Sequence, residues 1–181
     1  MPVRSFIFIF IFLFFCFLSF ETKANTLPYT QACRTINEDD FVQYQLQTDL
    51  KNKFVISITA FEDENCQTPY LLIERSFEIE SFKNENLNLK TEKISYTSLS
   101  DEVSQALNLS SYCGLKNWKT KIEQNVTGLK CDNYLQLKLG QAFYQILKAD
   151  ASSVWLGDDR SKKNGLSEAL RPDTYDLVFQ K

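Results

Sequence analysis

The 181-residue sequence contains no histidine, and this absence excludes more chemistry than any other feature of its composition. Histidine is the commonest general base and metal ligand, and it completes the Ser-His-Asp and Cys-His catalytic arrangements. No two cysteines lie two to four residues apart, which argues against a zinc site, and the five glycines are too far apart to form a phosphate-binding loop. The sequence therefore predicts a protein with no cofactor, no metal site and no catalytic residues.

Long apolar runs are also absent, except near the N-terminus. Arg4 precedes an uncharged apolar block from Phe6 to Phe20, and Thr22-Lys23-Ala24 supplies small residues at the −3 and −1 positions of a cleavage site. This order is typical of a secretory signal peptide. A helix of this block would span about 22 Å, less than the ~30 Å hydrocarbon core of a bilayer. We therefore predict a signal peptide over residues 1–24; an uncleaved membrane anchor is the alternative.

Residues 25–181 have a length suited to one domain. Their formal net charge is about −4, and nucleic-acid binding relies on clustered Lys and Arg, so we expect no nucleic-acid partner. After cleavage of the leader we expect no membrane span and a location in the periplasm or outside the cell.

Four cysteines remain after the leader: Cys33, Cys66, Cys113 and Cys131. An even count in an exported chain predicts two disulfides, for which three connectivities exist. We favour Cys33–Cys66 and Cys113–Cys131, because neighbouring pairs close the shorter loops. Each bond is expected to stabilise the fold by about 2–4 kcal/mol.

Short runs of alternating apolar and polar residues, typical of half-buried strands, fill most of this domain. The predicted strands cover residues 42–48, 54–59, 73–80, 87–99, 135–139, 142–148, 153–156 and 176–180. One helix is expected over residues 101–108, capped by Ser100. About eight strands in one chain predict an all-β fold, either a closed antiparallel barrel or, as the alternative, a β-sandwich.

Paired carboxylates and a basic patch are the remaining candidates for chemistry. Asp39-Asp40 and Asp158-Asp159 could support acid–base hydrolysis, although solvated loops are the favoured interpretation. Trp118 is flanked by lysines, and such a patch could receive an anion or a sugar; it is equally typical of guarded strand edges. The lysines are Lys116, Lys119, Lys121 and Lys130.

A series of short motifs in the C-terminal half resembles a known group of proteins. They are, in order, Tyr112-Cys113-Gly114, Trp118, Val126-Thr127-Gly128, Cys131, Tyr144-Gln145-Ile146, Leu156-Gly157-Asp158, Ser167 and Arg171-Pro172. The arrangement is similar to that of small exported bacterial proteins of unknown function with a lipocalin-like β-barrel. The resemblance implies an envelope or extracellular barrel and a small apolar ligand. It brings no catalytic residues.

The sequence departs from true lipocalins, which carry Gly-x-Trp on their first strand. Here the first tryptophan is Trp118, and by the same resemblance it is expected to stack with Arg171 at one end of the barrel. Trp118, Arg171 and Tyr144 are the candidate ligand-binding residues. We expect a non-enzymatic protein that holds a small apolar ligand inside the barrel, an expectation that a plug of Phe54, Phe77 and Phe143 would weaken. An interaction or inhibitor module acting through surface loops is the alternative.

Overall fold

The structure is a computed structural model that describes residues 28–37, 40–157 and 163–181. The predicted signal peptide, together with Asp39, Asp158 and Asp159 of the carboxylate pairs, lies outside these described residues.

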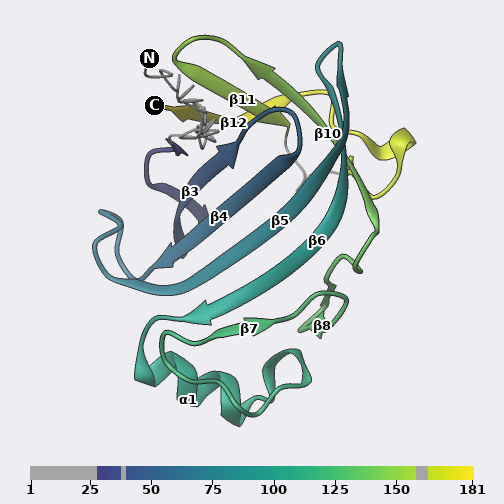
Figure 1. The fold of residues 1–181 in the computed structure, drawn as a ribbon. Coiled ribbons are helices and arrows are strands. Elements are labelled where there is room, and N and C mark those ends of the chain that lie inside the picture. The colour runs from purple at the N-terminus through teal and green to yellow at the C-terminus, as the bar shows by residue number, and fades with distance from the viewer. Residues whose placement is uncertain (1–27, 38–39, 158–162) are drawn as a thin grey trace, which may run out of the picture.

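Antiparallel strands make up most of the described chain (Figure 1). The strands are β1 (Tyr29–Thr30), β2 (Arg34–Asn37), β3 (Asp40–Thr48), β4 (Lys53–Phe61), β5 (Pro69–Lys83), β6 (Asn86–Ser98), β7 (Glu123–Asn125), β8 (Lys130–Cys131), β9 (Tyr134–Leu135), β10 (Ala142–Ala149), β11 (Ser153–Gly157) and β12 (Tyr175–Gln180). The helix of the described part is α1 (Asp101–Leu109), and short 3₁₀ turns cover Tyr112–Gly114 and Glu168–Leu170.

The main sheet closes on itself. Its order is β1-β12-β11-β10-β6-β5-β4-β3, and β1 also pairs with β3, so that these eight strands form a barrel. β2 continues beside β3, β7 pairs with β6, and β8 and β9 form a separate small hairpin. The predicted all-β barrel is therefore confirmed, and the sandwich alternative is wrong.

The alternation of apolar and polar residues identified seven of the barrel strands, all but the two-residue β1. The predicted strand over residues 135–139 is wrong beyond Leu135. There the backbone bonds locally, because Gly128 N–H donates to the Leu137 carbonyl and Gln136 N–H donates to the Leu129 carbonyl. The leucines at 135 and 139 point to solvent, whereas Gln136 is buried. Residues 135–139 thus alternate as a strand would, but beyond Leu135 they pair with no strand of the main sheet.

Polar side chains stabilise the β3–β4 turn and the N-terminus of α1. The Asp49 carboxylate accepts three backbone hydrogen bonds in the β3–β4 turn, from Lys51, Asn52 and Lys53, and these bonds lower the pKa of Asp49 to about 2. The Ser100 hydroxyl accepts from Val103 N–H and so caps α1, as predicted.

Both predicted disulfides are present. Cys33 is bonded to Cys66 in the β4–β5 loop, and Cys113 is bonded to Cys131. The first bond is half-buried, whereas the second belongs to a hydrophobic cluster.

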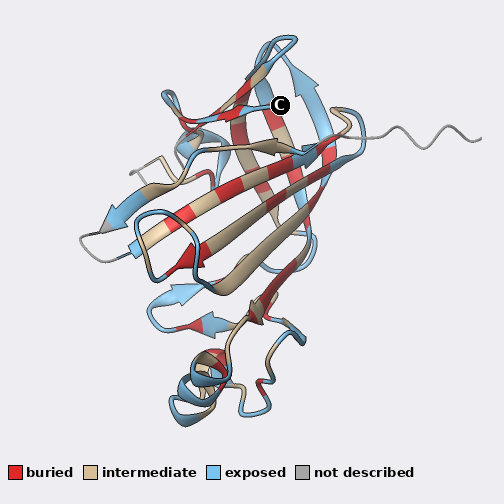
Figure 2. Ribbon diagram, turned by 90° about the vertical axis from the view of Figure 1, so that its left-hand side faces the viewer, coloured by how far each residue is buried: buried red, intermediate tan, exposed pale blue. Residues whose placement is uncertain are grey.

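Apolar side chains fill one end of the barrel interior. Buried residues alternate with more exposed ones along the strands, as Figure 2 shows. Phe77 stacks on Phe143 at 5.5 Å between ring centroids and lies tilted against Phe54 at 6.4 Å. Surrounding aliphatic residues complete this core: Leu46, Leu87, Leu89, Leu147, Val154 and Leu156. Apolar side chains therefore pack the interior at the level of these three phenylalanines.

Candidate functional site

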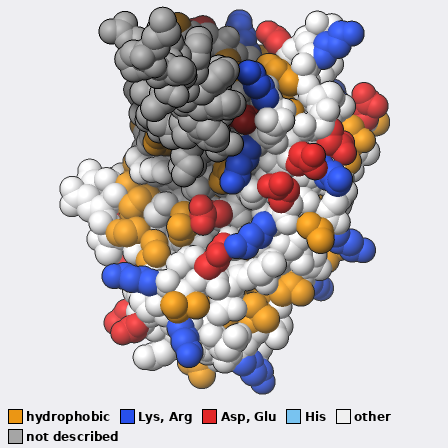
Figure 3. Space-filling view, viewed as in Figure 1, with side chains coloured by type: hydrophobic (Ala, Val, Ile, Leu, Met, Phe, Trp, Pro, Cys, Tyr) orange, Lys and Arg blue, Asp and Glu red, His pale blue; other side chains and the backbone are white. Residues whose placement is uncertain are grey.

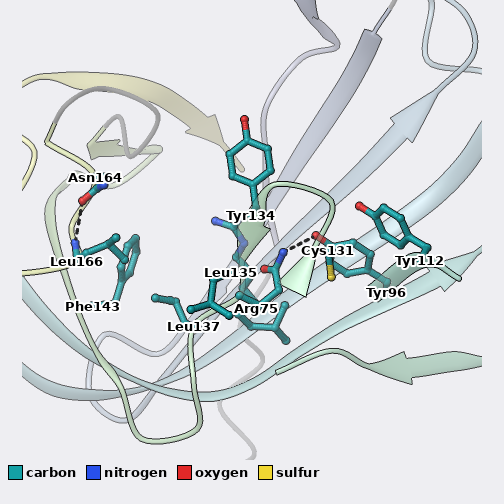
Figure 4. A pocket seen from close by; sticks show the side chains of 12 residues that line it. Arg75, Tyr96, Tyr112, Cys131, Tyr134, Leu135, Leu137, Phe143, Asn164 and Leu166 are labelled. Carbon is teal, nitrogen blue, oxygen red and sulfur yellow. Dashed lines mark hydrogen bonds between the residues drawn. The ribbon is translucent and has the colours of Figure 1, made fainter. Parts of the chain in front are cut away.

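A cavity lies at one end of the barrel, and we call it the mouth cavity. Its volume is about 480 Å³, within the range of ~300–1,000 Å³ typical of small-molecule pockets. It lies between the inner face of β5 and β6 and the connection 99–141, here called the cap (Figure 4). Its lining consists of Arg75, Ile94, Tyr96, Tyr112, Cys131, Tyr134, Leu135, Gln136, Leu137, Phe143, Asn164 and Leu166.

Arg75 reaches this space because of its place in the strand alternation. In β5 it falls on the same face as Ile73 and Phe77, and it lies opposite Ile56 of β4 and Ile94 of β6. Its nitrogen atoms point into the space that the lining residues enclose (Figure 4). A positive charge therefore occupies a position that the strand pattern reserves for apolar side chains.

A second space, here called the side cavity, adjoins the first at Arg75. It measures about 340 Å³ and is lined mainly by apolar residues of β3, β4 and β5, with Asp40 at its edge. Because Arg75 lines both cavities, its side chain stands between them. Phe143, which stacks on Phe77, lines the mouth cavity and provides its apolar floor.

The cap is held over the mouth by its own small core. This second hydrophobic cluster contains Ile94, Tyr96, Cys113, Trp118, Val126 and Cys131. The Gln136 side-chain amide donates to the Tyr96 hydroxyl at 3.1 Å, a contact drawn in Figure 4. Both partners are buried, so this hydrogen bond satisfies polar groups that would otherwise be costly to bury. The Gln136–Tyr96 hydrogen bond and apolar packing on Ile94 and Tyr96 thus join the cap to β6, and the Cys113–Cys131 disulfide joins two points within the cap.

Tyr96 and Tyr112, two of the three tyrosines that line the mouth cavity, remain uncharged near neutral pH. Burial raises the pKa of Tyr96 above 10, although the nearby Arg75 charge and the Gln136 hydrogen bond oppose that rise. Burial also raises the pKa of Tyr112 well above its ordinary value, and Tyr96 and Asp132 add to the effect. Among the described residues that line this cavity, Arg75 is therefore the only one that carries a charge.

The outer rim of the mouth cavity is apolar and exposed. Tyr134 and Leu135 of β9 are 76% and 64% exposed, and Leu166 is about half exposed. Leu166 is held in a tight turn in which its N–H donates to the Asn164 side-chain oxygen at 3.2 Å (Figure 4). These residues offer an apolar entrance to a cavity whose deeper wall carries the Arg75 charge.

Trp118 does not line the mouth cavity, contrary to its selection as a ligand-binding candidate. The side chain is only 3% exposed and packs against Tyr112 at 6.2 Å between ring centroids. Asn108 holds its backbone, since Trp118 N–H donates to the Asn108 side-chain oxygen at 2.8 Å and the amide nitrogen of Asn108 donates to the Trp118 carbonyl at 2.9 Å. The flanking lysines therefore surround no exposed aromatic surface. Trp118 is part of the cap core.

The predicted stacking of Arg171 on Trp118 is wrong. The Arg171 guanidinium lies over the Tyr144 ring at 5.2 Å. It donates to the carbonyls of Leu87 and Gln145 and to the Asn88 side chain, at 2.7–3.1 Å. Arg171 thus ties the C-terminal segment to β6 and β10, a structural role in which Tyr144 shares. Neither residue lines the mouth cavity.

Close packing explains why position 157 of β11, near the Arg171 contacts, is a glycine. A Cβ at Gly157 would lie 2.7 Å from both the Gln145 side-chain oxygen and Pro172, and 2.8 Å from Ile146. No other residue fits there without a shift of this wall of the barrel.

The described surface also has a more open hollow of about 450 Å³, whose lining includes Glu78, Lys90 and Glu92. On the face shown in Figure 3, acidic and basic side chains are interspersed. Within residues 28–37, 40–157 and 163–181 there is no group of three or more His, Cys, Asp and Glu side chains placed to hold a metal ion. No helix of the described part is both long and apolar enough to cross a bilayer.

Comparison with known proteins adds no further assignment, since a scan of protein-family models and a search of curated proteins each found no match. The functional argument therefore depends on the site itself. Sequence reasoning missed Arg75, although a signal was present: it is the single charged residue between Ile73 and Phe77 on the apolar side of its strand.

Proposed function

We propose that this protein is an exported, non-enzymatic binding protein that holds a small, largely apolar molecule in the mouth cavity of its barrel. The observation that carries the proposal is the cavity of about 480 Å³ between β5, β6 and the cap, which has an apolar floor and an apolar rim. It lies toward one end of the barrel, beside the interior that Phe54, Phe77 and Phe143 pack.

Two further features support this proposal. Two disulfides favour an oxidising compartment, in agreement with the predicted signal peptide. N-terminal sequencing of the protein from its own cells is expected to find Asn25 as the first residue. A retained leader would contradict the exported form.

Binding is best tested with a neutral fluorescent probe, N-phenyl-1-naphthylamine, whose emission rises in apolar surroundings. We expect saturable binding at about one site per chain. Leu135→Gln is expected to weaken binding about fivefold, because burial of part of a leucine against a ligand contributes about 1 kcal/mol. Leu109→Gln is the matched control, since Leu109 is 88% exposed on α1 and lines no cavity described above.

Equal binding by both variants would contradict the mouth cavity as the site, and no saturable binding would contradict the proposed function. Native mass spectrometry of the protein from its own cells should show one added small molecule, and the mass difference gives the mass of that ligand.

The exposed rim also fits the alternative of a protein-binding module. Tyr134 and Leu135 would then contact a partner directly. In that case Leu135→Gln would abolish a protein complex while the wild-type chain bound no apolar probe, the opposite of the pattern expected for a ligand-binding barrel.

A further inference from the structure

We propose that the ligand of the mouth cavity is an amphiphile with one oxyanion headgroup, a carboxylate or a phosphate, which binds the guanidinium of Arg75. This inference rests on the proposed function and specifies the class of ligand. It follows from the distribution of charge and apolar surface around Arg75.

The first argument is the charge of the cavity. No Asp or Glu occurs among the residues that line the mouth cavity, although Asp132 lies near enough to raise the pKa of Tyr96 and Tyr112, and both of these tyrosines are uncharged near neutral pH. A cation among apolar neighbours is poorly solvated, so an anion that enters the cavity gains more from it than from an exposed lysine. The planar guanidinium also matches carboxylate and phosphate oxygens in a two-point contact.

The second argument is the position of Arg75 relative to the floor and the rim. Leu137, Phe143 and Leu166 provide apolar wall on one side of the guanidinium, and Tyr134 and Leu135 form the exposed rim. A molecule whose head contacts Arg75 can therefore place an apolar tail against these walls. A ligand that is charged at both ends, or polar throughout, would leave the apolar wall without a partner.

The third argument limits the size of the effect. Arg75 already has an interaction in the free protein, and Asp40 lines the adjoining side cavity. A ligand anion must share the guanidinium or exchange with that contact, although five N–H donors allow more than one acceptor. We therefore expect a preference of about three- to tenfold for the anion, below the full value of a charged hydrogen bond.

The test compares three competitors with the same twelve-carbon tail: dodecanoate, dodecyl phosphate and dodecanol. Each displaces N-phenyl-1-naphthylamine from the full-length mature protein at pH 7.5, where both acids are ionised. The wild-type protein is expected to bind one or both anions about three- to tenfold more tightly than the alcohol. Arg75→Gln should remove that preference and leave dodecanol binding within about twofold.

Two variants test whether the preference for anions depends on the guanidinium of Arg75 in particular. Arg75→Lys keeps the charge and loses the planar fork, so it should retain part of the preference. Arg34→Gln removes a different half-buried arginine, which pairs with Asp176 and lines neither cavity, and it should bind all three competitors like the wild type. Dodecanol binding by each variant also reports whether the barrel is folded.

The possible failures are distinguishable. If wild-type protein binds the probe and dodecanol but prefers neither anion, the headgroup inference is wrong and the proposed function stands. If Arg75→Gln keeps the full preference, or Arg34→Gln loses it, Arg75 is not the headgroup site. If neither probe nor alcohol binds, the proposed function itself fails. Relative affinities of the two acids tell carboxylate from phosphate.

Discussion

Removal of the Cys113–Cys131 disulfide is expected to destabilise the protein more than removal of Cys33–Cys66, although it closes the shorter loop. The separations are 18 and 33 residues. Restriction of the unfolded chain alone gives about 3.2 kcal/mol for the first bond and about 3.7 kcal/mol for the second. By loop length, therefore, Cys33–Cys66 should contribute more by about 0.5 kcal/mol.

Burial reverses this order. Cys113 and Cys131 are almost fully buried in the cap core, whereas the other pair is half-buried. Deletion of two buried sulfur atoms adds about 0.8 kcal/mol for each, taken as equivalent to a methylene group. The double variant Cys113→Ala/Cys131→Ala should thus lose about 5 kcal/mol, whereas Cys33→Ala/Cys66→Ala, whose half-buried sulfur atoms lose about half as much from burial, should lose about 4.5 kcal/mol.

Urea unfolding followed by tryptophan fluorescence measures both losses. The free energies of unfolding extrapolated to water must be compared, not the urea midpoints. Removal of a cross-link also expands the unfolded state, and this steepens the dependence of the unfolding free energy on urea concentration. Probe binding provides a second readout: Cys131 lines the mouth cavity and the other pair does not, so only the first variant should bind the probe more weakly. A larger loss for Cys33→Ala/Cys66→Ala would refute the burial argument. Unchanged probe binding by Cys113→Ala/Cys131→Ala would refute the role of the cap.

Three further changes test other parts of the structure. Asn108→Ala should cost about 1–3 kcal/mol in urea unfolding, because it removes both side-chain bonds that hold the Trp118 backbone. The folded-state pKa of Asp49 lies near 2, below its ordinary 3.8, so its contribution to stability is present above about pH 4 and is lost as pH falls toward 2. The stability gap between wild type and Asp49→Asn should therefore narrow from pH 6 to pH 2. Gly157→Ala should lower stability by about 1–3 kcal/mol through steric overlap, whereas Gly114→Ala, which meets open space at φ +75°, should cost only about 1 kcal/mol; equal losses would contradict the packing account.

Alternation predicted the long strands because their side chains meet two different environments, the core and the solvent. It failed at residues 135–139, where Leu135 and Leu139 are exposed and Gln136 is buried against Tyr96. There the amide of Gln136 has a specific partner in β6, Tyr96, and this tertiary contact outweighs the apolar preference of the leucines. A pattern of residue types alone does not contain that partner.

The candidate site was predictable only in part, for a similar reason. Nothing in the sequence pairs Arg171 with Tyr144 in preference to Trp118, since the choice depends on how the C-terminal segment crosses β6 and β10. The sequence shows Arg75 as a charged residue on an apolar face of its strand. That Arg75 lines a cavity depends on the cap, which the strand pattern does not predict. Without residues 99–141 above it, the same arginine would be an ordinary charged side chain at a barrel end.

The cap also links the site to the compartment. The barrel is stabilised by a large core, including Phe77 and Phe179, whereas the cap has a small cluster and its helix α1 buries little beyond Ser104. Segments with few buried contacts open at lower free energy than the core to which they are attached. We therefore expect the cap to open more readily than the barrel, and the Cys113–Cys131 bond, which joins two points of the cap, to limit that opening. Because that bond persists in an oxidising environment and not in a reducing one, we expect a reducing environment to loosen the cap and with it the wall of the mouth cavity that Cys131 lines.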